Sequence, residues 1–376
     1  MAQFRGVELD DLELAGPRLR LRPWYDSDVP DLVAALATPN VHEFIALPNP
    51  YTRADAERFV RGIARRARTD ATGLECAVIE TSTGRLVGSA ALRFVGDAEI
   101  GYWIAPDAQG NGYAAEATTV LTDWAFSVGL PRVRLGCDVR NLASVRTALT
   151  AGFRYEGFAR AALISPGGGA VPPRRGELAR FARLPDDPVG PVGYAFPPLR
   201  AEGLSDGVLQ LRTARAEDGP ALAETDDELT LRWGFTGVAH TEAQATRESA
   251  TAGLEWLVGT TAPFSMVDVA TGRVAGSLRL RKAGPPQVGG IGYVVHPAFR
   301  GRGYTTRALR LLVPWAFETA DFARLELGAK EGNVASLRAA ANAGFEPDGI
   351  RARRMRNPDG TFADEVRYVL INPKYR

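Results

Sequence analysis

Apolar side chains recur along the chain in two patterns, one typical of helices and one typical of strands. Residues 114–128 carry apolar side chains three and four positions apart, at Ala117, Val120, Leu121 and Trp124. That spacing places them on one side of a helix. This stretch is therefore predicted to form a helix with one buried face.

Several shorter segments are rich in β-branched and aromatic residues and are predicted to be strands. Residues 70–80 and 85–95 flank a Thr-Gly turn and are expected to pair as a hairpin. Residues 262–282 repeat that pattern around a second Thr-Gly turn, and residues 133–141 and 153–164 enclose a short predicted helix. Strands in both directions mixed with helices predict an α/β fold with a mixed sheet.

Two stretches of the chain are nearly the same. QGNGYAAEA at residues 109–117 matches RGRGYTTRA at residues 300–308, 191 positions later. A nearly constant offset across the chain predicts two copies of one domain, each with its own core. The other matched pairs lie 190 to 192 positions apart: Leu19–Arg22 with Leu209–Arg212, Ile100–Tyr102 with Ile291–Tyr293, Trp124–Phe126 with Trp315–Phe317, Asn141 with Asn333, Ser144 with Ser336, and Ala151–Phe153 with Ala343–Phe345.

A segment rich in proline and glycine, residues 185–207, separates the two copies. Proline restricts φ and removes a backbone donor, so we expect an extended, semi-rigid connection. The predicted domains are residues 1–184 and 208–376. Tyr194 and Phe196 suggest that the connection packs against a domain rather than floating free.

Composition and charge exclude several classes of function. The 376 residues include 45 basic and 44 acidic side chains, and a formal net charge of +1 gives no electrostatic basis for binding nucleic acid or an anionic membrane. Two cysteines and three widely separated histidines offer no metal-ligand spacing, so no metal is expected. No apolar stretch is long enough for a membrane span, and residues 1–16 lack the apolar core of a signal peptide. We therefore expect a cytoplasmic protein.

The repeated glycine turn has the features of an anion site. It follows a short strand and leads into a predicted helix, whose first backbone N–H groups have no partner within the helix. Gly110 and Gly112 let the backbone approach an anion closely. The spacing of Gln109, Gly112 and Ala114 differs from the three-glycine dinucleotide fingerprint and from the Walker loop. A plain loop explains one copy about as well, whereas two copies in the same context favour the anion site.

With these motifs, both halves resemble the GNAT superfamily of acyl-CoA-dependent N-acyltransferases, closest to the branch that resembles ribosomal-protein alanine N-acetyltransferases. The resemblance is carried by the glycine turn after Gly-Tyr, the two Asn-x-x-Ser sequences and the two Ala-Gly-Phe sequences. It covers nearly the whole chain outside the connection. It implies two tandem domains, each a mixed twisted sheet flanked by helices with a splayed central strand pair, and acetyl-CoA as the acyl donor.

The resemblance also implies which residues bind acetyl-CoA. The glycine turn would hold the diphosphate, the strand before it would pair with the pantetheine arm, and the Asn-x-x-Ser asparagine would contact the same arm. In the first copy the implied residues are Trp103, Ile104, Gln109, Gly110, Asn111, Gly112, Tyr113, Ala114 and Asn141. In the second copy they are Val294, Val295, Arg300, Gly301, Arg302, Gly303, Tyr304, Thr305, Asn333 and Ser336.

Acetyl transfer to an amine requires a base that takes a proton from the ammonium and a donor for the leaving thiolate. The resemblance implies Glu99 as the base and Ser144 as the donor; a solvated strand-end position is the alternative for Glu99. The second copy has Gly290 where Glu99 stands. The first copy is therefore the better catalytic candidate. The second would bind acyl-CoA weakly, shape the acceptor site or use another base, such as Glu326.

Four aromatic residues are candidates to line the acceptor site, and capping the core is an equally weighted role for them: Phe44, Tyr51, Trp233 and Phe235. Cys137 stands in an apolar strand with no histidine near it in sequence. We interpret it as a small buried residue rather than a nucleophile.

These features favour an N-acetyltransferase that acts on a primary amine of a small molecule, such as an antibiotic or a specialised metabolite. A protein N-terminus is the alternative acceptor, and an acyl chain longer than acetyl is a variant of the same reaction. A different class of function, an acyl-CoA-binding regulatory or scaffold protein without turnover, is the competing hypothesis.

Overall fold

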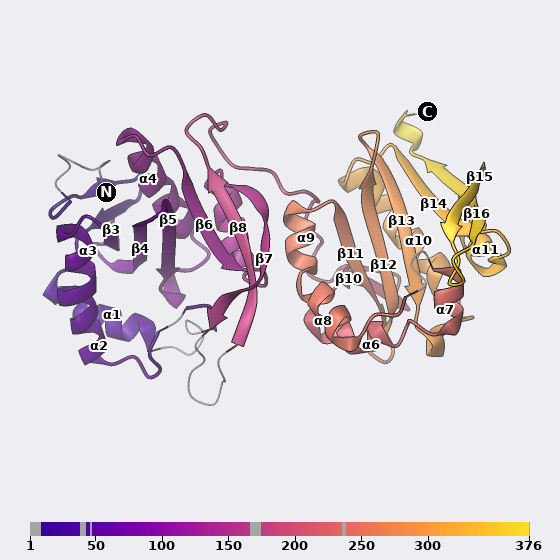
Figure 1. The fold of residues 1–376 in the computed structure, drawn as a ribbon, viewed down its shortest axis with the longest axis horizontal. Helices are drawn as coiled ribbons and strands as arrows, with labels where there is room; N and C mark the ends of the chain where they lie inside the picture. Colours follow the sequence, from indigo (N-terminus) through magenta and orange to yellow (C-terminus); the bar gives the residue numbers. More distant parts are fainter. Residues whose placement is uncertain (1–8, 38–42, 46, 166–173, 235–237, 376) are drawn as a thin grey trace. The chain divides into compact units, whose positions relative to one another are not determined.

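The chain folds into two compact units, Met1–Gly193 and Tyr194–Arg376, drawn in Figure 1. Each unit builds an eight-stranded sheet of its own with helices packed against it. The predicted α/β fold with two tandem domains is therefore confirmed. The computed structural model describes residues 9–37, 43–45, 47–165, 174–234 and 238–375.

The first unit follows the order of elements that its apolar pattern predicts. The hairpin expected from residues 70–95 is formed by β3 and β4, and the helix expected at residues 114–128 is α4. Its strands are β1 (Leu14–Ala15), β2 (Leu19–Arg22), β3 (Gly73–Glu80), β4 (Leu86–Val95), β5 (Asp97–Ile104), β6 (Val133–Asp138), β7 (Arg154–Ser165) and β8 (Arg174–Arg183). Its α-helices are α1 (Val29–Leu36), α2 (Arg53–Arg58), α3 (Arg65–Thr69), α4 (Tyr113–Ser127) and α5 (Leu142–Thr150).

The second unit repeats this order. Its strands are β9 (Leu204–Ser205), β10 (Leu209–Thr213), β11 (Thr261–Asp268), β12 (Val274–Ala283), β13 (Val288–Val295), β14 (Arg324–Lys330), β15 (Glu346–Arg356) and β16 (Phe362–Ile371). Its α-helices are α6 (Gly219–Ala223), α7 (Glu228–Trp233), α8 (Glu242–Ala250), α9 (Ala252–Val258), α10 (Tyr304–Pro314) and α11 (Val334–Asn342).

Both sheets are mixed. The first has the order β1-β2-β3-β4-β5-β6-β8-β7, and the second has the matching order β9-β10-β11-β12-β13-β14-β16-β15. All neighbours pair antiparallel except β5 with β6 and β13 with β14. These parallel pairs are joined by crossovers that contain α4 and α10, which is how parallel strands are connected.

Each unit has a core of its own. In the first, Leu32 of α1 and Val60 pack with Ala77 and Ile79 of β3. In the second, Leu309 of α10 packs with core strands and with the aromatic residues of α9 and β11. A buried ion pair repeats at the start of both units, between Arg22 and Asp28 and between Arg212 and Asp218, each at 2.7 Å.

The connecting segment divides between the two units. Val192 donates its backbone N–H to the carbonyl of Leu149 in the first unit, and Phe196 donates to Trp256 in the second. The Phe196 side chain is buried in the second core, whereas Tyr194 is exposed. Within the described residues, no helix combines the length and apolar character that crossing a membrane requires.

Candidate active site

The parallel strand pair at the centre of each sheet opens part way along. In the first unit, the pairing of β5 with β6 ends at Ile100 and Leu135, although β5 continues to Ile104. In the second, the pairing of β13 with β14 ends at Ile291 and Leu327. The backbone groups beyond these points form an edge that an extended ligand can join by hydrogen bonds.

A glycine turn lies at the end of each opened strand. Gly110 and Gly112 adopt positive φ angles of 81° and 78°, and Gly301 and Gly303 repeat them at 73° and 72°. Residues other than glycine rarely adopt this backbone conformation. Gly112 and Gly303 are the N-cap residues of α4 and α10. The unpaired N–H groups of each helix start therefore lie at the turn.

The residue before each turn ties it to the strand. Gln109 donates Nε2 to the carbonyl of Ile104 at 3.2 Å, and Arg300 donates Nε to the carbonyl of Val295 at 3.3 Å. Arg300 also holds Asp227, the N-cap residue of α7, through two hydrogen bonds of 2.6 and 2.8 Å. This contact lowers the pKa of Asp227 well below its usual range. The Arg300 side chain thus fixes α7 against the turn.

The tyrosines of the two turns serve as anchors. Tyr113 and Tyr304 are buried and donate short hydrogen bonds to Glu80, the last residue of β3, and Asp268, the last residue of β11. These bonds raise the pKa of both tyrosines. Only their backbones are thus left to take part in binding at the turn.

A cleft of about 660 Å³ occupies the opening of the second unit. Its walls come from the opened part of β13, the glycine turn, α11, and Trp233 of α7. Several residues that the sequence predicts for this site line it: Val294, Val295, Arg300, Gly301, Gly303, Tyr304, Thr305, Asn333 and Ser336. The fold therefore brings the predicted second set together, apart from Arg302.

A tyrosine hydroxyl lies beside the Asn-x-x-Ser serine in both units, and the second unit forms a hydrogen bond there. In the second, the Tyr293 hydroxyl lies 2.6 Å from Oγ of Ser336, and burial raises the pKa of Tyr293. In the first, the Tyr102 hydroxyl lies near Ser144 but has no hydrogen-bond partner among the described residues. Burial raises the pKa of Tyr102 to about 12. Both phenols therefore stay protonated at neutral pH and can donate a hydrogen bond.

The asparagines of the same motif cap helices. Oδ1 of Asn141 accepts from the N–H of Ser144 at 3.1 Å at the start of α5. Asn333 does the same for Ser336 at 3.2 Å at the start of α11. Capping uses the oxygen and leaves the side-chain NH₂ group as the donor for a ligand.

Glu99 lies on the other face of the sheet from the hydroxyl pair. Side chains alternate along β5: Tyr102 faces α5, whereas Glu99 shares a face with Trp103, which packs on the core under α1. Its carboxylate is 51% exposed and lies 3.4 Å from Nη2 of Arg134. A candidate proton acceptor and a candidate proton donor thus stand on opposite faces, with the opening between them.

The second unit has a different charge arrangement at this point. Gly290 pairs with Glu326 in the register of β13 and β14, as Glu99 pairs with Arg134 in the first unit. Oε1 of Glu326 accepts from Arg324 at 2.6 Å and lies 3.0 Å from Arg367. The carboxylate of Glu326 is therefore engaged by two arginines.

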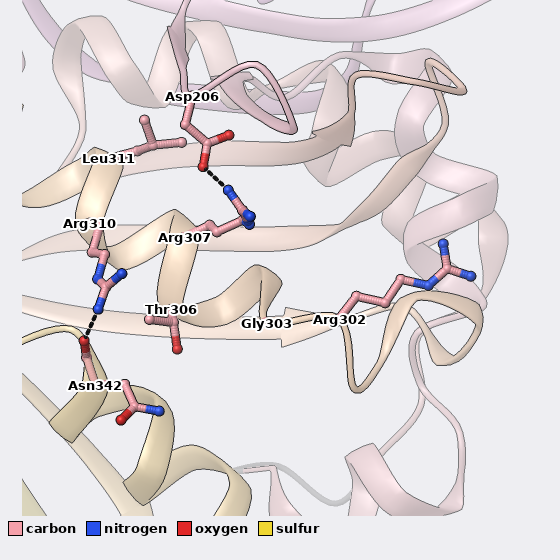
Figure 2. Close-up of a pocket in the computed structure, with 8 residues that line it drawn as sticks. All are labelled: Asp206, Arg302, Gly303, Thr306, Arg307, Arg310, Leu311 and Asn342. Atoms are coloured by element: carbon pink, nitrogen blue, oxygen red, sulfur yellow. Dashed lines mark hydrogen bonds and ion pairs between the residues drawn. The ribbon is translucent and has the colours of Figure 1, made fainter.

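A basic pocket of about 630 Å³ lies beside the second glycine turn, shown in Figure 2. It is lined by Arg302, Arg307 and Arg310. Arg307 pairs with Asp206 at 2.6 Å, and Arg310 donates to the carbonyl of Asn342. The matched positions in the first unit are Asn111, Glu116 and Thr119. An anion at the second turn thus meets more positive charge.

The first turn has its own side-chain support. Arg18 pairs with Glu116 at 2.8 Å and donates Nη1 to the carbonyl of Asn111 at 3.0 Å. Val208 and Arg307 occupy the matched positions in the second unit. In the second unit the helix carries the positive partner, Arg307, and the loop before β10 carries the negative partner, Asp206. The ion pair between this loop and the first turn of the helix therefore has the opposite polarity in the two units.

The aromatic candidates for an acceptor wall have different environments. Trp233 lines the second cleft, Tyr51 belongs to the first core, and Phe44 is exposed; Phe235 lies outside the described residues. Cys137 is buried, and desolvation raises its pKa to about 12, which disfavours a reactive thiolate. In the described part of the chain, no group of three or more His, Cys, Asp or Glu side chains is placed to hold a metal ion.

Sequence reasoning missed the hydroxyl partners and the supports of the turns. Tyr102 and Tyr293 follow the glycine in the repeated Ile-Gly-Tyr sequence, so the repeat marked their positions. It could not show that each hydroxyl lies beside a serine about 40 residues later, because the fold alone brings the two side chains together.

Fold and site together define a class of protein: two tandem α/β domains, each opened at the centre of its sheet beside a glycine turn that begins a helix. The profile of the Acetyltransferase (GNAT) domain matches residues 18–154 and 209–346, which together are more than half of the chain. The chain therefore belongs to the GNAT acetyltransferase family.

Individual relatives cover one part of the chain each. The "Probable N-acetyltransferase YjcK" of Bacillus subtilis is 32% identical over 112 residues, which are 29% of this chain and 61% of that protein. YoaA of the same organism, described as an uncharacterized N-acetyltransferase, is 28% identical over 38% of this chain and 83% of its own length. The ribosomal-protein-S5-alanine acetyltransferase of Vibrio fischeri is a structural match at 20% identity, with a TM-score of 0.39, over 45% of this chain and 95% of that one.

Proposed function

We propose that the chain is an N-acetyltransferase that moves the acetyl group of acetyl-CoA onto a primary amine of a small molecule. The main support is the pair of opened strands, each followed by a glycine turn that begins a helix. An open strand edge suits the amides of a pantetheine arm, and the N–H groups of a helix start suit a diphosphate.

The proposed binding roles follow the two copies. In the N-terminal domain, residues 1–184, Trp103 and Ile104 would pair with the arm, the turn from Gln109 to Ala114 would hold the diphosphate, and Asn141 would donate to the arm. In the C-terminal domain, residues 208–376, the corresponding groups are Val294 and Val295, the turn from Arg300 to Thr305, and Asn333 with Ser336. Residues 185–207 link the two.

We assign the chemistry of the N-terminal domain to Glu99 and Ser144. The amine nitrogen attacks the thioester carbonyl, the C–N bond forms and the C–S bond breaks. Glu99, on one face of the sheet, takes the ammonium proton directly or through one water. Ser144, beside the Tyr102 hydroxyl on the other face, gives its hydroxyl proton to the leaving thiolate, and the second proton that the nitrogen loses as the amide forms returns to Ser144.

A small amine is favoured over a protein as the acceptor because the net charge of +1 provides no acidic excess to attract a strongly basic ribosomal protein. The test measures thiol release from acetyl-CoA with a panel of small amines and with peptides that begin with alanine or serine. Faster release with the peptides than with every small amine would move the assignment to protein N-termini.

The competing function is acyl-CoA binding without turnover, and Gly290 at the position of Glu99 favours it for the C-terminal domain. Calorimetry with acetyl-CoA separates the two candidates. Binding together with no thiol release above the enzyme-free rate would support the binding protein. A Glu99→Gln variant that keeps binding and loses the turnover contributed by the N-terminal domain would support the enzyme.

A further inference from the structure

The second unit holds a buried carboxylate beside its cleft. Glu365 of β16 is 8% exposed. Its Oε2 is buried without a hydrogen-bond partner among the described residues, and Nη1 of Arg351 lies 3.5 Å from it. A buried carboxylate oxygen that lacks a hydrogen bond is costly to keep, so its presence points to a ligand or a reaction.

The carboxylate lies over the opening of the sheet. A Cβ at Gly328 would be 2.0 Å from Oε1 of Glu365, so the carboxylate fills the space that a side chain at position 328 would need. Gly328 is the first residue of β14 beyond its last pair with β13, and it lines the cleft. Glu365 therefore stands over the first unpaired residue of β14, beside the cleft.

Glu365 is on the face where the first unit carries Glu99. It stands opposite Lys330 in the register of β14 and β16, and so shares a face with Gly328. Leu327 points to the other face, where it packs in the core with Tyr293 and α10. On the face of Glu365, a Cβ at Gly290 or Gly292 would meet no atom within 4 Å, which leaves room for an acceptor.

The same place in the first unit is apolar. Gly136 matches Gly328, and the residue over it is Leu178, whose Cδ1 would be 3.2 Å from a Cβ there. Leu178 stands opposite Asp138 as Glu365 stands opposite Lys330. A carboxylate over this glycine, that of Glu365, therefore occurs in the unit that lacks a counterpart of Glu99.

The other charged groups on this face have partners elsewhere. Lys330 donates Nζ to the carbonyl of Arg232 at 2.8 Å, and burial lowers the pKa of Lys330. Glu326 is held by Arg324 and Arg367, and both arginines also contact Asp348. Arg351 approaches Glu365 no closer than 3.5 Å. Among these acids, Glu365 is the one with an unbonded oxygen at the opening.

We propose that Glu365 is the proton acceptor of the C-terminal domain, which makes this domain a second catalytic centre rather than a binding-only copy. The proposal rests on acetyl-CoA binding in this cleft, as proposed above. The amine nitrogen attacks the thioester carbonyl and the C–S bond breaks. One ammonium proton passes to Glu365, directly or through one water. Ser336, beside Tyr293, gives its hydroxyl proton to the thiolate, and the second proton that the nitrogen loses as the amide forms returns to Ser336.

The test uses the full chain with Glu99→Gln, which leaves the second centre as the source of general-base catalysis. Two probe amines are compared: ethylamine, which is protonated at neutral pH and needs a base, and hydroxylamine, which is already neutral. Adding Glu365→Gln should lower the acetylation of ethylamine by about 100-fold, the usual scale of general-base catalysis. The acetylation of hydroxylamine should fall far less, by about threefold or less.

Two matched variants serve as controls in the same background. Asp364→Asn removes the neighbouring carboxylate, which accepts from the Arg353 backbone at 2.7 Å, and should leave both rates unchanged. Glu365→Asp keeps a carboxylate and should restore part of the ethylamine rate. Calorimetry with acetyl-CoA accompanies each variant to verify that the cleft still binds.

The outcomes separate this proposal from the general one. Equal loss with both amines, or no loss, would overturn the role of Glu365. A Glu99→Gln chain that binds acetyl-CoA in both domains and acetylates neither amine would show that the second centre does not exist, while the proposed function of the first stands. A wild-type chain that does not bind acetyl-CoA would overturn both.

Discussion

The two units share a backbone and differ in where they place charge. One residue before the last pair at the opening, the first has Glu99 opposite Arg134 and the second has Gly290 opposite Glu326. By contrast, the φ angles of the turn glycines differ by less than 10° between the units. The backbone geometry of the turn is therefore common to both units, whereas the side chains around it have diverged.

This contrast separates binding from chemistry. The features common to both units are the opened strand, the glycine turn, the asparagine cap and a tyrosine hydroxyl near the serine, which is hydrogen-bonded to it in the second unit. The features that differ are the carboxylates on the face of the sheet that carries Glu99 in the first unit, and the ion pair at the turn. We therefore expect both units to bind acetyl-CoA, with different affinities and different bases.

The largest effect should come from valine at the N-cap glycine of each turn. Gly112→Val or Gly303→Val forces a β-branched residue into a positive φ of 78° or 72° and places its side chain at the turn where the anion would sit. We expect affinity for acetyl-CoA to fall by about 100-fold or more in that unit alone, with the number of sites per chain dropping from two to one by calorimetry.

Gly129→Val is the control for strain without contact to the ligand. Gly129 has a φ of 86° and follows the other end of α4. The substitution should lower the free energy of unfolding and leave both acetyl-CoA sites intact. Two full sites in Gly303→Val would mean that the second turn does not hold the diphosphate.

The stability of the two units should also respond differently to alkaline pH, because both cysteines of the chain belong to the first unit. Burial raises the pKa of Cys137 to about 12, while an unfolded thiol ionises near pH 9. Its contribution to stability is therefore complete below pH 9 and is lost as the pH rises toward 12. At pH 10.5 the loss should be about 2 kcal/mol in the unfolding of the first unit.

Cys137→Ala tests this, because Ala329 fills the matched position in the second unit. Denaturant unfolding at pH 8 and pH 10.5 should show a smaller alkaline loss for the variant than for the wild type. An identical loss in both chains would mean that this thiol is not protected in the folded state.

The contrast between backbone and side chains also explains what could be predicted from the sequence. The turn glycines, the helix at 114–128 and the domain repeat follow from local backbone preferences and periodicity, and the structure contains all three. Glu365 was not found, because its position over Gly328 depends on the pairing of β14 with β16. Arg300 was predicted as a ligand residue; its guanidinium holds Asp227, more than 70 residues earlier, and no local pattern indicates that contact.

A smaller effect should follow removal of the hydroxyl that meets the serine. Tyr293→Phe in the Gly112→Val background leaves Ser336 without its 2.6 Å partner, and the thiolate without that hydrogen-bond chain. We expect turnover of the second unit to fall by about tenfold, equivalent to about 1.4 kcal/mol, with little change in acetyl-CoA affinity. A loss of affinity with unchanged turnover would assign the pair to binding.

The smallest effect should come from exchanging the polarity of the ion pair at the turn. Asp206→Arg with Arg307→Glu gives the second unit the arrangement of Arg18 and Glu116, and keeps the ion pair while moving the positive charge away from the helix start. Because CoA is anionic, we expect about threefold to tenfold weaker binding at low salt in the Gly112→Val background, and a smaller difference at high salt. The reverse exchange, Arg18→Asp with Glu116→Arg in the Gly303→Val background, should strengthen binding by a similar factor. Unchanged affinity in both exchanges would mean that the bound phosphates lie away from Arg307, and the basic pocket of Figure 2 would then play no part in the difference between the two units.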